Sequence, residues 1–348
     1  MTIDEIYMHR CLQLASLGMG NVAPNPMVGA VLVYNNRIIG EGYHKQYGQA
    51  HAEVNCINAV EQNDIPLIPL STLYVSLEPC AHHGKTPPCA DLIIEKEIKK
   101  VIVGCRDPFV QVDGKGIEKL QRAGVEVTTG ILEQACLELN KRFLTFHTKQ
   151  RPYIILKWAQ TANSKIASTT NERLYITNEF TNRLVHKWRS EEMGILVGTN
   201  TALLDDPELT NRLWSGKSPV RLVLDINLRL PQSSKIFNRQ QPTILLNLLR
   251  NKEENNLQYC QVTKDENIAA QILDICFQKN IQSIIVEGGA KLLQTFIDAG
   301  LWDEARVITN TELYIENGLN APQPAAYTLS HSENVFTDRI DYFFPFIS

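Results

Sequence analysis

Hydrophobic and polar residues in the first 148 positions alternate in patterns that predict both helices and strands. Apolar residues at helical spacing predict a helix over 4–17. Strands at 29–34 and 37–43 flank Asn35 and Asn36, a pair typical of a hairpin turn. Further strands are predicted at 73–79, 100–105 and 125–128, and helices at 51–60, 90–96, 116–123 and 133–146. This order favours a central sheet that helices cover on both faces.

A polar stretch that ends in proline, residues 148–152, separates this part from a second α/β pattern. The second part has predicted strands at 153–159, 193–199, 220–225, 243–247 and 283–286, helices at 178–191 and 268–279, and a polar loop at 317–324. Gly288 and Gly289 link a strand to a helix. They either hold a pyrophosphate on backbone N–H groups or serve packing, and they do not form the G-x-G-x-x-G motif. Because 348 residues are long for one core, we predict two domains, 1–148 and 152–348.

Composition narrows the class of function. A net charge of −4 gives no basic field to attract nucleic acid. No apolar run approaches the roughly 20 residues of a membrane span. Eight scattered cysteines without a signal-peptide pattern indicate a reducing cytoplasm rather than a disulfide framework. We therefore expect a cytoplasmic protein that acts on small molecules, with neither nucleic acid nor membrane as partner.

The strongest chemical signal is the set His51, Glu53, Cys80 and Cys89. One imidazole and two thiolates suit a catalytic zinc site with a fourth position open to water. Bound zinc lowers the pKa of water to about 7, and Glu53, not needed as a ligand, can carry the proton to a departing amine. Zinc deaminases share H-x-E followed by P-C-x-x-C, although eight residues separate the cysteines here. The set predicts hydrolytic deamination of an amino-substituted heterocycle.

Other interpretations of these residues stay open. A structural zinc site would need a fourth protein ligand, which His82 or His83 could supply, but it would leave Glu53 without a role. Asn25, between two prolines, either presents its amide to a pyrimidine edge or forms an ordinary turn. Lys85 is either a cation for a phosphate group or a solvated surface lysine.

The pattern Glu-Pro-Cys-x-His-x-Gly-x-Thr-Pro-Pro-Cys over 78–89 resembles the bacterial bifunctional deaminase/reductase family of riboflavin biosynthesis. Three further segments, 24–29, 203–212 and 287–289, resemble the same family in the same order. Together they extend the resemblance over about residues 5–310. The pattern at 78–89 is the specific part, since Glu-Gly-Gly at 287–289 alone would be weak.

The resemblance implies an α/β fold with a cytidine-deaminase-like three-layer domain followed by a dihydrofolate-reductase-like domain. It implies zinc-dependent deamination of 2,5-diamino-6-ribosylamino-4(3H)-pyrimidinone 5′-phosphate, and then NADPH-dependent reduction of the ribosyl chain to ribityl. The implied cofactors are Zn²⁺, one per chain, and NADPH/NADP⁺. Family members often self-associate, so a homo-oligomer is compatible with the resemblance, although the sequence shows no interface pattern.

The resemblance also implies roles for individual residues. His51, Cys80 and Cys89 would bind the metal, with Glu53 as the catalytic acid and base. The substrate pocket of the first domain would be lined by Asn25, His44, His82, Lys85 and Asp107. NADPH would contact Ala159, Thr201, Asp205, Gly289, Ala290, Lys291, Leu292, Leu293, Gln294 and Thr295. The substrate of the second domain would contact Arg173, Arg189, Leu209, Arg212 and Glu287, and the guanidinium groups among them suit two-point binding of phosphate.

Several positions depart from the family pattern. The family's Ser-Leu-Asp-Gly reads Thr-Ala-Asn163-Ser164 here, so an acidic side chain and a glycine are missing. Arg173 replaces a serine, Tyr175 a tryptophan and Phe109 an asparagine. One alternative is therefore a monofunctional deaminase with a degenerate reductase domain. Two others are a nucleic-acid deaminase, which the acidic charge and 7% aromatic content disfavour, and a zinc-stapled scaffold that binds a nucleotide.

Overall fold

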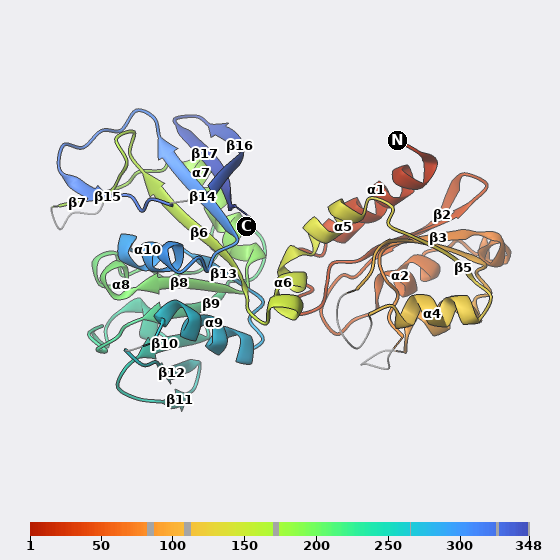
Figure 1. The fold of residues 1–348 in the computed structure, drawn as a ribbon, viewed down its shortest axis with the longest axis horizontal. Coiled ribbons are helices and arrows are strands. Elements are labelled where there is room, and N and C mark those ends of the chain that lie inside the picture. Colours follow the sequence, from red (N-terminus) through yellow and green to blue (C-terminus); the bar gives the residue numbers. More distant parts are fainter. Residues whose placement is uncertain (82–86, 108–112, 170–173, 265, 325–326, 347–348) are drawn as a thin grey trace. The chain divides into compact units, whose positions relative to one another are not determined.

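The computed structural model describes residues 1–81, 87–107, 113–169, 174–264, 266–324 and 327–346. The chain divides into two compact units, Met1–Gln150 and Arg151–Ser348. Each unit is built around its own large sheet, drawn from red to yellow in the first unit and from green to blue in the second (Figure 1).

The sheet of the N-terminal unit has the strand order β2-β1-β3-β4-β5 among the described residues. The strands are β1 (Gly29–Tyr34), β2 (Arg37–Tyr43), β3 (Thr72–Leu77), β4 (Lys100–Cys105) and β5 (Glu126–Thr129). β1 is antiparallel to β2 and β3, whereas β3, β4 and β5 are parallel. Asn35 and Asn36 have φ angles of 46° and 62°, as a tight hairpin turn requires, so the predicted hairpin is present.

Helices cover both faces of this sheet (Figure 1). On one face, α1 (Ile3–Ser16) and α5 (Glu133–Leu139) place Met8 and Cys136 against Ile102. On the other face lie α2 (Ala52–Asn58), α3 (Cys89–Glu95) and α4 (Lys115–Arg122), with the short 3₁₀ helix η1 (Ile65–Leu70) beside them. The unit is thus the three-layer α/β sandwich that the sequence predicts.

The single helix predicted over 133–146 is wrong, because the chain forms two helices there. α5 ends at Leu139 and α6 (Lys141–Lys149) begins after Asn140. The Asn140 side chain accepts a hydrogen bond from the Met27 N–H at 2.8 Å and donates one to the Met27 carbonyl at 2.9 Å. This pair of bonds to a distant loop fixes Asn140 at φ −100° and ψ 16°, outside helical geometry.

The large sheet of the C-terminal unit has the order β11-β12-β10-β9-β8-β13-β6-β14-β17-β16 in the described part of the chain. The parallel strands are β6 (Tyr153–Gln160), β8 (Gly194–Gly198), β9 (Val220–Leu224), β10 (Thr243–Asn247), β12 (Leu257–Gln261), β13 (Ser283–Val286) and β14 (Glu304–Asn310). Antiparallel strands close both edges, namely β11 (Lys252–Glu254), β16 (Tyr327–Val335) and β17 (Asp338–Pro345).

Two hydrophobic clusters hold helices on opposite faces of this sheet (Figure 1). One face carries α9 (Ile268–Gln278) and α10 (Ala290–Asp298). The other carries α7 (Glu179–Glu191), α8 (Thr199–Asp205) and the 3₁₀ helix η2 (Lys235–Phe237). Because β6, β8 and β13 are parallel, their carboxyl ends meet at one edge, where ligands bind in open α/β sheets.

The C-terminal part differs from the sequence prediction in its strands. The predicted loop at 317–324 contains β15 (Gly318–Asn320), which pairs with β7 (Lys165–Ser168) as a separate small sheet. Neither β16 nor β17 is predicted, and β16 is exposed along nearly all of its length. A strand held mainly by backbone pairing has no alternation of buried and exposed residues to mark it in the sequence.

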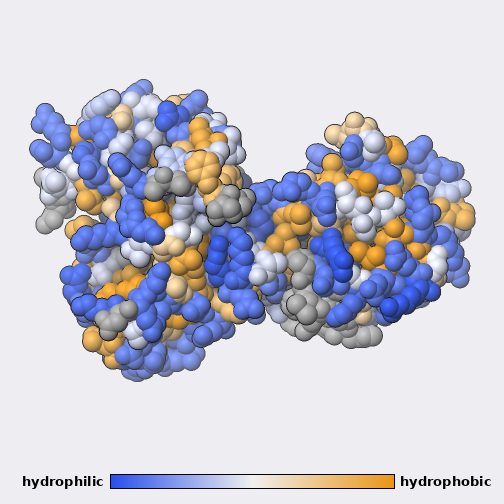
Figure 2. Space-filling model, viewed as in Figure 1, coloured by the Kyte–Doolittle hydropathy of each residue, from blue (hydrophilic) through white to orange (hydrophobic). Residues whose placement is uncertain are grey.

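No helix in the described ranges is long and apolar enough to cross a membrane. Hydrophobic residues on the face seen in Figure 2 are interspersed with hydrophilic ones on each unit.

Candidate functional site

Three potential metal ligands meet in the N-terminal unit. His51 Nδ1 lies 3.3 Å from Cys89 Sγ and 3.6 Å from Cys80 Sγ, and the ligand atoms of the three residues all lie within 4.8 Å of one another. Tetrahedral zinc with bonds of about 2.0–2.3 Å holds its ligand atoms about 3.5 Å apart. The donor set and its spacing therefore fit one zinc ion.

Local structure explains why these residues meet. His51 is the N-cap of α2, Cys80 follows the end of β3, and Cys89 is the first residue of α3. The Cys89 N–H, at the start of its helix, donates to Cys80 Sγ at 3.4 Å. A hydrogen bond from Cys89 outweighs the effect of burial and, with a second from His51, lowers the pKa of the Cys80 thiol, whereas the same bond and burial raise the pKa of the Cys89 thiol. The two thiols thus share one proton, and the thiolate is favoured on Cys80.

Glu53 lies in the first turn of α2, beside the metal group, with only 3% of its surface exposed. Among the described residues, the ligand atoms that cluster within 4.8 Å of one another belong to His51, Cys80 and Cys89, and not to Glu53. Burial raises the pKa of the Glu53 carboxyl, and the neighbouring Cys80 raises it further. Burial therefore favours the protonated form of this carboxyl.

Asn25 and His44 lie beside the metal group. The His44 Nδ1 is 3.0 Å from the Ala50 carbonyl, which can only accept, so Nδ1 carries the hydrogen. The other ring nitrogen, Nε2, then accepts from the Asn25 amide at 3.2 Å. Burial lowers the pKa of His44, which keeps this tautomer neutral. The His44 ring stands edge-on to that of His51, with centroids 5.5 Å apart.

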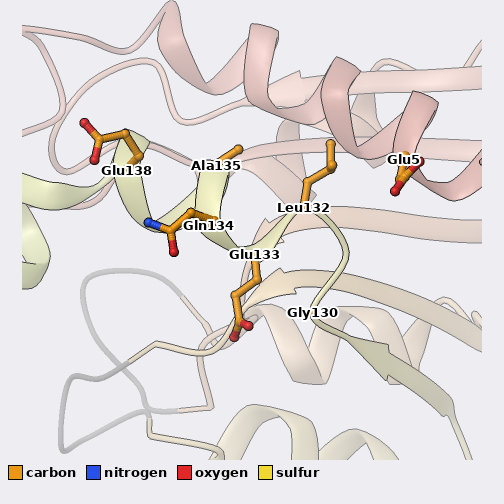
Figure 3. A pocket seen from close by; sticks show the side chains of 7 residues that line it. All are labelled: Glu5, Gly130, Leu132, Glu133, Gln134, Ala135 and Glu138. Carbon is orange, nitrogen blue, oxygen red and sulfur yellow. The ribbon is translucent and has the colours of Figure 1, made fainter. Parts of the chain in front are cut away.

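The remaining predicted residues of this site divide into two groups. Asp107 is buried after the end of β4, and its N–H donates to Glu78 at 3.3 Å. His82, His83, Lys85 and Phe109 lie outside the described residues, so the structure does not place them. A surface depression elsewhere on this unit contains no predicted site residue (Figure 3). It is lined by Glu5, Gly130, Leu132, Glu133, Gln134, Ala135 and Glu138.

In the C-terminal unit, the predicted residues Arg189 and Glu287 form a two-point ion pair. Both N–O distances are 2.7 Å, and Lys157 Nζ approaches the same carboxylate at 3.6 Å. Burial alone would raise the pKa of Glu287, but Arg189 and Lys157 lower it to about 2. The carboxylate is therefore ionised at neutral pH, at the end of β13.

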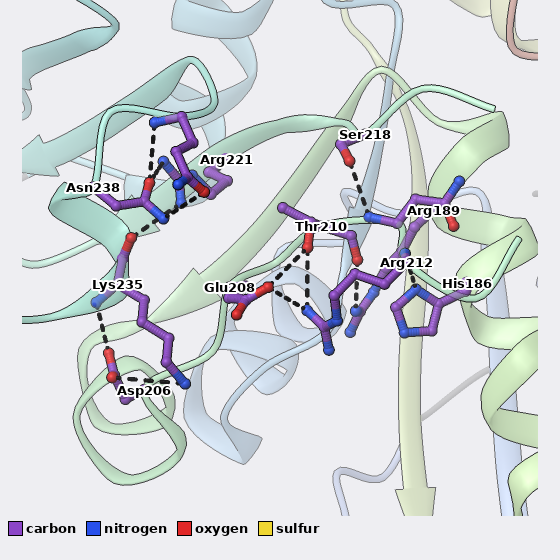
Figure 4. A network of polar contacts seen from close by, with 12 residues as sticks. His186, Arg189, Asp206, Glu208, Thr210, Arg212, Ser218, Arg221, Lys235 and Asn238 are labelled. Atoms are coloured by element: carbon purple, nitrogen blue, oxygen red, sulfur yellow. Dashed lines mark hydrogen bonds and ion pairs between the residues drawn. The ribbon is translucent and has the colours of Figure 1, made fainter. Parts of the chain in front are cut away.

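Arg212 is linked through Thr210 to Arg189 of this ion pair (Figure 4). Its N–H donates to Nδ1 of His186 at 3.0 Å, and its guanidinium donates to Glu208 at 3.0 Å and to the Thr210 hydroxyl at 3.1 Å. Arg189 donates to the carbonyl of the same threonine at 3.3 Å. The Arg212 side chain is 51% exposed, so its charge faces solvent.

Two of the predicted cofactor residues, Thr201 and Gly289, meet at the glycine turn between β13 and α10. Gly289 has φ 74°, a conformation that favours glycine. A Cβ on Gly288 would lie 3.0 Å from Cγ2 of Thr201, and one on Gly289 would lie 3.4 Å from its hydroxyl. Thr201 of α8 therefore packs against the turn at the carboxyl edge of the sheet.

Other predicted residues of this unit are placed differently. Leu292 and Leu293 belong to the hydrophobic core under α10, and Leu209 belongs to the core on the other face, so their side chains are buried in packing. Ala159 lies on β6 and Asp205 ends α8. Ala290 and Lys291 are the first two residues of α10. Further along this helix, Gln294 donates to Asp298, and the Thr295 hydroxyl donates to the Lys291 carbonyl. Arg173 lies outside the described residues.

Two family models match the chain, one on each unit. Residues 1–105 match the cytidine and deoxycytidylate deaminase zinc-binding region, and residues 152–311 match the RibD C-terminal domain. The riboflavin biosynthesis protein RibD of Aquifex aeolicus is 41% identical over 86% of this chain and 85% of its own length. The chain belongs to the RibD family.

Other members of the RibD family are similar over most of their length. RibD of Escherichia coli is 33% identical over 86% of this chain and 86% of its own. A Thermotoga maritima structure, described as a diaminohydroxyphosphoribosylaminopyrimidine deaminase/5-amino-6-(5-phosphoribosylamino)uracil reductase, is 34% identical with a TM-score of 0.90 and covers 99% of each chain. RibD of Acinetobacter baumannii is 29% identical with the same TM-score and the same coverage. The expected fold, a cytidine-deaminase-like domain followed by a RibD reductase domain, is confirmed.

The position that differs from the RibD pattern at 161–164 forms a closed turn. The Asn163 side chain accepts from the Thr161 hydroxyl at 2.7 Å and donates to the Ile315 carbonyl at 2.8 Å. Ser164 has φ 57°, the left-handed region that a glycine adopts without strain. Tyr175 is 77% exposed. Both ends of the Asn163 amide are thus bound within the protein.

Sequence analysis missed two side chains at the reductase site, Lys157 and His186. Lys157 is a single charge within the apolar strand β6, and a charge in a buried strand needs a partner, so the sequence did contain a signal. His186 precedes Arg189 by three residues on α7, a spacing that shares a helix face. It is 1% exposed.

Proposed function

We propose that this chain carries out two consecutive steps of riboflavin biosynthesis. The N-terminal unit hydrolytically deaminates 2,5-diamino-6-ribosylamino-4(3H)-pyrimidinone 5′-phosphate, and the C-terminal unit then reduces the ribosyl chain to ribityl with NADPH. Membership of the RibD family and the presence of both family models support this function. The observation that carries it is the group of His51, Cys80 and Cys89 with Glu53 buried beside it.

In the deamination, zinc would be held by His51, Cys80 and Cys89. When bound, it supplies a water that ionises near neutral pH. The buried Glu53 carboxyl takes the proton of the attacking water and passes it to the departing ammonia.

The pyrimidine would be held by Asn25 and His44. Because His44 Nε2 accepts from the Asn25 amide nitrogen, the amide oxygen of Asn25 is directed to another donor, such as an amino group of the substrate. His82, Lys85 and Asp107 complete the proposed pocket, with Lys85 as the cation for the phosphate group.

In the reduction, NADPH would lie at the glycine turn, near Ala159, Thr201, Asp205 and the backbone of 289–295, and supplies the hydride. The fork of Arg189 is already bound to Glu287, so it serves to hold that carboxylate ionised. Arg212 also pairs with a carboxylate, that of Glu208, but it is half exposed, so it is the better phosphate cation. Leu209 contributes its backbone, and Arg173 is proposed from the family pattern alone.

Further properties follow from the same proposal. We assign deamination to residues 1–148 and reduction to 152–348, which the two compact units support. A cytoplasmic location is supported by eight free cysteines. We propose small-molecule substrates and no nucleic acid, which the net charge of −4 supports. A homo-oligomer is compatible with the family resemblance. The monofunctional alternative is disfavoured because a reductase domain is present.

The test is an incubation of purified, zinc-loaded protein with the diaminopyrimidine ribosyl phosphate. Ammonia release and loss of NADPH absorbance are followed together, with and without NADPH. Ammonia in both samples and NADPH oxidation in the second are expected. Ammonia with persistent NADPH would favour the monofunctional alternative. Protein treated with a chelator should lose ammonia release, and unchanged release would contradict the role of the metal.

A further inference from the structure

Glu78 is a buried carboxylate to which the proposed mechanism gives no role. It lies directly before Pro79 and Cys80 and is 4% exposed. Within the described residues, its two oxygens accept hydrogen bonds from four backbone N–H groups of one later segment. The donors are Asp107 at 3.3 Å and Gly114 at 3.0 Å on Oε2, and Gly116 at 2.9 Å and Ile117 at 3.3 Å on Oε1.

The four donors join the end of β4 to the start of α4. Gly116 and Ile117 lie in the first turn of α4, where N–H groups lack partners within the helix and a negative charge is favourable. A Cβ on Gly116 would overlap the carbonyl oxygen of Pro79. The start of α4 is therefore seated directly on the backbone between Glu78 and Cys80.

Helix α3 holds Cys80 from its other side. The carbonyl of Cys80 accepts from the Ala90 N–H at 3.1 Å, and its sulfur accepts from the Cys89 N–H at 3.4 Å. Glu78 thus connects a segment fixed at the metal group to the backbone of Asp107. In the described part of the chain, the Glu78 carboxylate follows the end of β3 and binds the segment that begins with Asp107 through four hydrogen bonds.

We propose that Glu78 is a positioning residue of the deamination, which fixes Asp107 relative to Cys80 and so aligns the bound substrate with the metal group. This role rests on the proposed function of the N-terminal unit. A neutral amide cannot replace the carboxylate. The oxygen of a glutamine would serve one pair of N–H groups, while its NH₂ would face the donors of the other pair. Two buried N–H groups would then lack acceptors, and the segment that carries Asp107 would shift.

The test is Glu78→Gln in the full-length, zinc-loaded chain. The measurements are zinc per chain, kcat and KM for ammonia release, and NADPH oxidation by the C-terminal unit of the same preparation. We expect KM for deamination to rise at least about tenfold, as expected for the loss of hydrogen bonds to a charged group, while zinc content and NADPH oxidation stay unchanged. Glu95→Gln, on exposed α3 surface, is the matched control and should leave KM unchanged.

A double-mutant cycle with Asp107→Asn separates positioning from a general structural role. If Glu78 acts through Asp107, the double variant should have about the KM of the worse single variant, because the two effects are not additive for coupled residues. Additive effects, or a fall in kcat with zinc loss and an unchanged KM, would overturn the proposal.

A second variant and the unsubstituted chain separate misfolding and general inactivity from the proposed role of Glu78. If the glutamine variant does not fold, Glu78→Asp keeps the charge with a shorter reach. Its KM should rise in the same direction, and an unchanged KM would overturn the role of Glu78. Failure of the unsubstituted chain to release ammonia would instead contradict the proposed function of the unit.

Discussion

The guanidinium of Arg189 binds the carboxylate of Glu287 through two bonds of 2.7 Å, with 15% and 6% of these side chains exposed. This pair joins α7 to the end of β13, next to the glycine turn that we propose binds NADPH. It uses the fork of the arginine on a protein carboxylate rather than on a substrate phosphate. The position of the Glu287 carboxylate therefore depends on the forked geometry of the Arg189 guanidinium as well as on the positive charge of Arg189.

Arg189→Lys should lower kcat/KM for the reduction at least about tenfold. An ammonium keeps the charge but cannot make both bonds, and a hydrogen bond between charged groups contributes about 1.5–3 kcal/mol. Ammonia release by the other unit should not change. The assay is NADPH absorbance with the deaminated substrate, and Arg183→Lys, exposed on the same helix, is the control. Equal loss of both activities would argue against separate sites.

Glu53→Gln should abolish most of the deamination and leave the metal bound. Positioned acids and bases contribute about 10²- to 10⁴-fold to rates, and a glutamine cannot carry the proton. Zinc per chain, measured by atomic absorption, should equal that of the unsubstituted protein, because Glu53 is not among the clustered ligands. Glu61→Gln, at an exposed position nearby, should change neither quantity. Near-normal ammonia release from the Glu53 variant would exclude the assigned role.

The stability of the C-terminal unit should fall as the pH decreases from about 6.5 to 4. Burial, with Arg189 and Arg212, lowers the pKa of His186 to about 4, against about 6.5 in an unfolded chain. Between these values the unfolded chain binds a proton that the folded chain does not, so acid favours unfolding. Glu287, with a pKa of about 2, adds a loss only below about pH 4.5.

His186→Gln keeps an acceptor for the Arg212 N–H and removes the titrating ring. Its free energy of unfolding, from denaturant titrations at several pH values, should therefore change less between pH 6.5 and 4.5 than that of the unsubstituted chain. His331→Gln, at an exposed position, should show the original slope. Identical slopes for all three proteins would mean that His186 is not the group responsible.

Ser164→Gly should stabilise the protein by up to about 1 kcal/mol. Ser164 has φ 57°, and the left-handed region costs a residue with a Cβ roughly 1–2 kcal/mol. The entropy that a glycine loses on folding offsets about 0.5–1 kcal/mol of this gain. Thermal unfolding provides the measurement. Ala162→Gly, where φ is not positive, should instead destabilise, and a loss of stability in both variants would contradict the argument from strain.

Local sequence patterns located most of the elements and the metal group. The hairpin around Asn35, the helix that begins after His51 and the helix that begins at Cys89 lie where apolar spacing, turn residues and prolines predict them. His51, Cys80 and Cys89 lie at two helix starts and after a strand end. Because they are of residue types that bind metals, the sequence alone indicates a metal site before any contact is known.

Tertiary structure decided what residues far apart in the sequence do to one another. Asn140 breaks a predicted helix because it bonds to Met27, and β16 exists because β17 pairs with it. The four N–H groups on Glu78 lie 29 to 39 residues away. The partner of Arg189 is 98 residues away. The spacing of hydrophobic residues and the residue types are local properties, so the sequence by itself determines the elements and the chemistry that depend on them. The pairing of buried polar groups is not local, because each finds its partner only when the elements pack.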